Sequence, residues 1–233
     1  MIGDLYFRRW APKPLMNKDK RINFFNDCSL RLKSWFYDLP AQLRIDRRND
    51  FPQAYTLHMM YHTICILLAR PFLHSENTTT TPHPLQSGQE MRQKATDVCL
   101  TSSKAVVAAA RSYRREFGSF RLSPVTATFS TLSAALVFYD VYREHGTCWS
   151  DLESCVQVLG ELSTIWDPAR RYQREMGRLL NQTSAAREVG ESSTSGVESS
   201  GATNAAGVSV SGRWFHCPFM TRSVLIWYLL RAC

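Results

Sequence analysis

The stretch PQAYTLHMMYHTICILLAR, residues 52–70, decides the fold class of this chain. Its large apolar side chains recur at three- and four-residue steps and so share one helical face: Leu57, Met60, Tyr61, Ile64, Leu67 and Leu68. The other side is only weakly polar, and a helix that is apolar nearly all round is a central, buried one. Pro52 suits the first turn of this helix, and Pro71 ends it after Arg70.

The same periodicity predicts five further helices on either side of this one. We expect them at residues 24–39, 89–116, 124–144, 150–166 and 169–180, with a polar loop at 74–87. No strand-like alternation appears between Val125 and Leu180. The sequence therefore predicts an all-α domain over residues 1–182, a bundle or array of about six helices.

The composition changes after residue 182. Ser, Thr, Gly and Ala fill 21 of the 30 positions from 183 to 212, which predicts a disordered linker because too little apolar surface is available for burial. Residues 213–233 form a short apolar tail. The hypothesis for this tail is a gene-model artefact, either a mis-predicted exon or a read-through end.

Charge and cysteine content restrict the class of protein further. The 233 residues carry a net charge of +8, which permits contact with nucleic acid or an acidic surface but says nothing about fold. The seven cysteines include no CxxC pair, so a reducing compartment is favoured over a disulfide framework. Neither residues 51–69 nor 224–230 supply the roughly twenty apolar residues of a membrane span.

Candidate chemistry is sparse. His58 and His62 stand four residues apart on one helical face, but a zinc protease helix needs HExxH and Met59 occupies the position of the glutamate. Two helix histidines with local hydrogen bonds are the favoured interpretation. Cys148 and Cys155 lie about 10 Å apart along a helix, too far to share one metal ion. No phosphate-binding loop, nucleophile elbow or carboxylate pair occurs, so we expect no catalytic residue and no enzyme.

The run WFYDLPAQLRI (35–45), followed by LHMMYHTICILLARPFL (57–73), resembles the middle regulatory domain of fungal zinc-cluster transcription factors. The likeness is to the nitrogen-assimilation and xylanolytic-activator branch. APKPL (11–15) and TFSTLSAALVF (128–138) extend it over roughly residues 5–180. The family-motif positions, interpreted as core or regulatory residues, are Trp35, Leu39, Pro40, Leu43, Leu57, Tyr61, His62, Leu68, Arg70, Pro71 and Phe72.

The resemblance implies a function and also marks a departure from the family. Full-length members carry zinc on two CxxCx6C half-motifs, whereas every cysteine here is isolated, so we expect no metal ligand and no cofactor. The implied chain is a C-terminal portion or truncated relative, acting in the nucleus as a regulatory or interaction module without its own DNA-reading element. The implied partners are coregulators or other parts of a transcription factor, and a small-molecule effector is a further candidate. The resemblance implies at most weak, non-specific binding to DNA and no binding to a membrane.

Two other interpretations remain open from the sequence. The chain is alternatively an independent small-molecule-sensing or catalytic helical domain, or a non-functional truncated paralogue.

Overall fold

The computed structural model describes residues 18–45, 51–73 and 85–192, and residues Asn23–Arg187 form one compact unit. Six α-helices and no strand occur within the described ranges, which confirms the predicted all-α class. The helices are α2 (Lys18–Tyr37), α3 (Pro52–Ala69), α4 (Leu85–Phe117), α5 (Thr126–His145), α6 (Trp149–Ser163) and α7 (Asp167–Ser192). Short 3-10 turns follow α2, α3 and α4, at Ala41–Leu43 (η1), Arg70–Phe72 (η2) and Phe120–Leu122 (η3).

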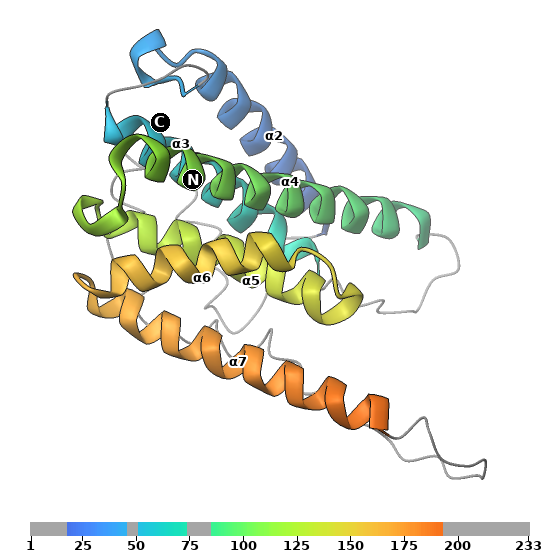
Figure 1. Cartoon of the computed structure of the whole chain (residues 1–233). Helices are drawn as coiled ribbons and strands as arrows, with labels where there is room; N and C mark the ends of the chain where they lie inside the picture. The colour runs from blue at the N-terminus through green and yellow to red at the C-terminus, as the bar shows by residue number, and fades with distance from the viewer. Residues whose placement is uncertain (1–17, 46–50, 74–84, 193–233) are drawn as a thin grey trace. The chain divides into compact units, whose positions relative to one another are not determined.

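Helix α3 is buried at the centre of this unit, as its apolar sequence predicts. It packs against α4 and α5, and Figure 1 shows α2 on its outer side. Only three of the six residues predicted to form the buried stripe are fully buried. Tyr61, Ile64 and Leu68 are buried, but three positions expected there are only partly buried: Leu57, Met60 and Leu67. The weakly polar side is buried instead, because α4 and α5 cover it, and its least exposed members are Met59, Thr63 and Ile66.

Small side chains bring α4 and α5 close to their neighbours. Every residue of α5 from Ala127 to Tyr139 is buried, and alanine, serine and threonine make up more than half of that run. Two of the buried hydroxyls bond to their own helix: Thr131 Oγ1 donates to the Ala127 carbonyl at 2.8 Å, and Ser133 Oγ donates to the Phe129 carbonyl at 2.8 Å. Such pairing satisfies the hydroxyls without needing space for a partner side chain.

Helices α2 and α7 lie on opposite sides of the α3–α6 core (Figure 1). Helix α7 buries one apolar stripe, and the Trp166 indole just before it donates to the Ser123 carbonyl at 3.1 Å. Further along α7, Thr183 Oγ1 lies 3.1 Å from the Tyr139 hydroxyl of α5. Helix α7 is thus attached to the core by hydrogen bonds as well as by its buried stripe.

Several predicted boundaries differ from the structure. Helix α2 begins at Lys18 rather than at residue 24, and it ends at Tyr37, before the proline (Pro40) that was expected to end it. Helix α4 begins at Leu85 rather than at residue 89. Helix α7 continues to Ser192, so the first ten residues of the predicted linker are helical. A helix can form there without burying apolar side chains, so the scarcity of apolar residues did not indicate where the helix ends. The rest of the linker, the tail at 213–233 and the APKPL run lie outside the described residues.

Candidate functional site

Five aromatic or imidazole rings meet where α2 crosses α3. The Phe36 ring stacks on Tyr61 with centroids 3.9 Å apart and an interplanar angle of 12°. His58 and His62 each present an edge to Phe36, at centroid distances of 4.7 and 5.7 Å. Trp35 lies beside Tyr61 at 6.3 Å. We call Trp35, Phe36, His58, Tyr61 and His62 the ring cluster; stacked and edge-on pairs of this kind stabilise a packed crossing.

The two histidines of the ring cluster have different surroundings. His58 Nε2 lies 2.9 Å from the Leu43 carbonyl, and because a carbonyl only accepts, this nitrogen carries the proton and donates. Burial, followed by the nearby His58, lowers the pKa of His62 from 6.5 to about 4. The hydrogen bond of His58 thus joins α3 to η1, 15 residues away in the sequence, rather than being local to its own helix as expected. Within the described ranges, no group of three His, Cys, Asp or Glu side chains is placed to hold a metal ion.

Two further ionisable groups at the ring cluster, the Tyr61 hydroxyl and the Cys65 thiol, are also held neutral. Burial, reinforced by the neighbouring Cys65 thiol, raises the pKa of Tyr61. Burial also raises the pKa of Cys65, despite hydrogen bonds with Tyr61 and Ser102. A thiol reacts as its thiolate, so Cys65 is a poor nucleophile at neutral pH. The ring cluster can pack and orient α2, but it offers no activated group for catalysis.

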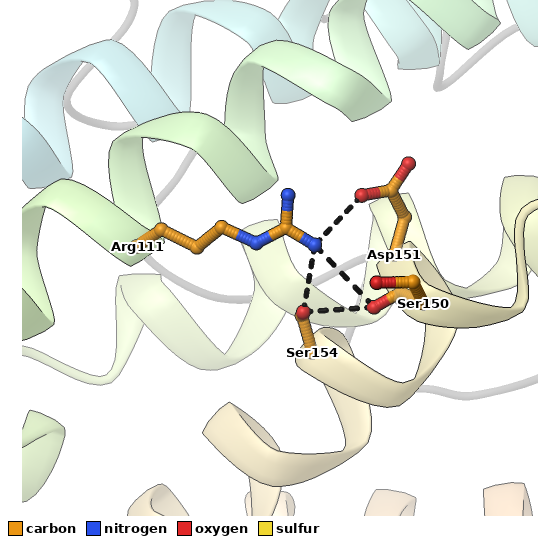
Figure 2. Close-up of polar contacts among 4 residues, drawn as sticks. All are labelled: Arg111, Ser150, Asp151 and Ser154. Carbon is orange, nitrogen blue, oxygen red and sulfur yellow. Dashed lines mark hydrogen bonds and ion pairs between the residues drawn. The ribbon is translucent and has the colours of Figure 1, made fainter.

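A set of polar contacts joins α4 to α6 (Figure 2). Arg111 Nη2 contacts three groups at the start of α6: Asp151 Oδ1 at 2.9 Å, Ser154 Oγ at 3.0 Å and the Ser150 carbonyl at 3.4 Å. One helical turn further along α4, Arg114 Nη2 pairs with Glu161 Oε1 at 2.9 Å. These two arginines fix the spacing of the two helices.

The same side chains border a small pocket. Its volume is about 20 Å³, and Val106, Ala110, Thr131 and Val158 are among the residues that line it with Arg111 and Arg114. That volume holds a water molecule and is far smaller than the roughly 300 Å³ of a metabolite site. This pocket therefore does not support a small-molecule sensor.

The chain aligns with the nitrogen assimilation transcription factor nirA of Emericella nidulans at 27% identity, over 74% of this chain and 18% of that protein. It is a homologue of fungal transcription factors. A second nitrogen assimilation transcription factor, nit-4 of Neurospora crassa, matches at 24% identity over 66% of this chain and 13% of its own length. A transcriptional regulatory protein of Schizosaccharomyces pombe also matches at 24% identity, over 64% of this chain and 24% of that protein.

These matches confirm the resemblance drawn from the sequence. The chain spans less than a quarter of the length of each of these relatives. No protein-family model and no solved structure matches it. Among the described helices, none combines the length and apolarity that crossing a bilayer requires.

Several of the family-motif positions form two groups at opposite ends of the α2–α3 crossing. Trp35, Tyr61 and His62 belong to the ring cluster, and Leu43 supplies the carbonyl that faces His58. At the other end of α3, Phe72 meets Phe25 of α2 edge-on at 5.3 Å. The motif therefore marks two places where aromatic side chains of α2 meet those of α3 and η2.

The remaining motif residues support the turns between these contacts. Leu39 and Leu68 are buried, at 4% and 7% exposure, and Leu57 is partly buried. Arg70 and Pro71 form η2 with Phe72 and are partly buried. Pro40 is exposed and precedes η1, so a core role for it is wrong.

Sequence reasoning missed the contribution of Arg44. Its Nε donates to the Leu39 carbonyl at 3.0 Å, and its Nη2 donates to the Tyr37 carbonyl at 2.9 Å. These carbonyls lie at and just beyond the C-terminus of α2, where helix carbonyls lack internal partners. The available signal was an arginine after the LP turn of WFYDLPAQLRI.

Proposed function

We propose that this chain is a helical regulatory module of a fungal transcription regulator, located in the nucleus, that acts by binding protein partners rather than by chemistry. The observation that carries the proposal is the alignment with nirA over 74% of the chain. The neutral state of the ionisable groups in and beside the ring cluster supports a role without chemistry, because no nucleophile or general base is activated there. The module is assigned to residues 1–182, with the later residues as a separate segment.

The position of α2 is the feature through which such a module would respond to a partner. Helix α2 contacts its neighbours through few side chains: Phe36 stacks on Tyr61, and Phe25 meets Phe72 edge-on. Lys94 of α4 also donates to Asn26 Oδ1 at 2.9 Å, while the Arg44 hydrogen bonds close the end of α2 itself. An element attached by a few side chains opens at a lower free-energy cost than the core it rests on. Coregulators, or other parts of a transcription factor, would bind the surface that depends on this position.

A tethering experiment tests the proposal. The full chain is fused to a heterologous DNA-binding domain in a filamentous fungus, and transcription from a reporter carrying the matching sites is measured. We expect a several-fold change relative to the DNA-binding domain alone. A fusion that is stably expressed and leaves the reporter unchanged would overturn the proposal, as would reproducible substrate turnover by the purified chain.

Two adjacent aromatic residues of α2 provide a matched pair of variants. Phe36→Ala removes the ring that stacks on Tyr61 and loosens α2, so it should reduce the reporter response. Tyr37→Ala removes a neighbouring ring that is 84% exposed and should leave the response unchanged. Equal effects of the two variants would show that the position of α2 is not what partners recognise.

A further inference from the structure

Helix α7 presents two faces of opposite character. Its buried stripe comprises Ala169, Tyr172, Met176 and Leu179, none more than 8% exposed. Its exposed face carries four arginines, which we call the arginine face: Arg170, Arg171, Arg174 and Arg178. At 100° and 1.5 Å per residue, the four lie within an arc of about 100° and along about 12 Å of the axis. They point away from the side that packs on the core.

Much of the charge on the arginine face is not neutralised. Arg170 pairs with Asp167 at 3.2 Å and Arg178 pairs with Glu175 at 2.8 Å, but these arginines remain 55% and 70% exposed. Exposed pairs of this kind are weak and screened by salt. Among the described residues, Arg171 and Arg174 have no carboxylate within ion-pairing distance. The face thus keeps a positive potential that a polyanion would complement.

The surface around these arginines favours a phosphate backbone over a protein partner. Protein interfaces need desolvated aromatic or aliphatic anchors, and the large exposed apolar residues in the described part of the chain lie on other elements: Leu30, Tyr37, Phe51, Leu122, Trp149 and Ile165. A phosphate backbone needs only cations and hydrogen-bond donors, and the planar guanidinium matches phosphate geometry. Gly177 lies in open space beside Arg178, so a sugar–phosphate strand can approach closely.

We propose that the arginine face of α7 binds the phosphate backbone of duplex DNA, independently of sequence. Single-stranded nucleic acid is disfavoured because its binding uses aromatic stacking platforms, and no aromatic residue stands between Arg170 and Arg178 except the buried Tyr172. This contact reads no bases and would hold a protein-binding module next to DNA. It goes beyond the proposed function, which concerns protein partners.

Fluorescence anisotropy of the full chain with a labelled duplex of about 20 base pairs and arbitrary sequence tests the proposal, at salt from about 50 to 200 mM. Each phosphate contact contributes about 0.9 to the slope of log K against log salt. We therefore expect Arg171→Ala/Arg174→Ala to weaken binding and to make the slope shallower by about 2. Arg171→Lys/Arg174→Lys keeps the charge and should keep the wild-type slope.

A double variant on α4 controls for net charge. Arg92→Ala/Lys104→Ala also removes two exposed positive charges, far along the chain from α7, and should leave the slope unchanged. Equal slope changes in the two alanine variants, with thermal melts showing both folded, would overturn the proposal. So would wild-type binding to poly-glutamate or single-stranded RNA that is tighter than binding to the duplex, or no duplex binding at low salt. The tethered reporter fusion needs no α7 arginine, so either proposal can fail without the other.

Discussion

Helices α5 and α2 reach their neighbours in different ways. In α5, thirteen consecutive side chains from Ala127 to Tyr139 are buried, and small residues let adjacent backbones approach closely. In α2 the buried apolar residues are Phe25, Cys28 and Leu32, and aromatic rings bridge the gap to α3. Close packing forms many dispersion contacts, whereas a few rings leave an element dependent on each of them. Helix α5 therefore sets the fold, and α2 is the part whose position can change.

The largest expected effect compares one phenylalanine from each helix. Phe138 of α5 is 0% exposed, so Phe138→Ala should lower the free energy of unfolding by about 3–5 kcal/mol. Phe36 of α2 is only partly buried, so Phe36→Ala should cost about 1–2 kcal/mol, including its stacking on Tyr61. Urea unfolding followed by far-UV circular dichroism measures both. Equal losses would refute the contrast between the two helices.

The second prediction concerns pH at the α2–α3 crossing. The pKa of His62 is about 4 in the folded chain, against 6.5 when unfolded, so between these values the unfolded chain binds the extra proton. Stability should therefore fall as pH drops from 6.5 to 4, by at most about 1.4 kcal/mol per pH unit from this group. The urea midpoint measured across this range reports the change.

Two variants separate His62 from the general effect of acid. His62→Gln removes the titrating ring, so the decline between pH 6.5 and 4 should become shallower. Tyr37→Ser, on the exposed side of α2, should retain the wild-type steepness. A His62→Gln profile as steep as wild type would show that protons enter elsewhere.

The sequence could predict the features that depend on local spacing, but not those that depend on tertiary neighbours. The apolar periodicity of residues 52–70 identified α3 and its central burial, because that signal resides in local spacing. It could not show that Met59 and Ile66 would be more buried than Leu57, since tertiary neighbours decide which side of an all-round apolar helix is covered. The His58–Leu43 and Arg44–Tyr37 hydrogen bonds join residues across turns and have no periodic signature.

The third prediction tests the hydrogen bonds that Arg44 makes at the C-terminal end of α2. Arg44→Gln removes both guanidinium hydrogen bonds to the Tyr37 and Leu39 carbonyls. Because the side chain is exposed, water can replace part of what is lost, and we expect a cost of about 1 kcal/mol. Amide hydrogen exchange should accelerate in the last turn of α2 and stay unchanged in α5. Faster exchange spread evenly over both helices would contradict a local role.

The last prediction concerns two threonines of α5, whose replacement by valine should change the stability in opposite directions. Thr128 is 0% exposed, and its hydroxyl has no hydrogen-bond partner in the described part of the chain, so the isosteric Thr128→Val should raise stability by about 1 kcal/mol. Thr131 is 2% exposed and donates to the Ala127 carbonyl at 2.8 Å, so Thr131→Val should lower stability by a similar amount. Urea midpoints of the two variants measure the difference. If Thr128→Val also destabilises, a buried water pairs with that hydroxyl, and the close packing assigned to α5 is less complete than its buried surface indicates.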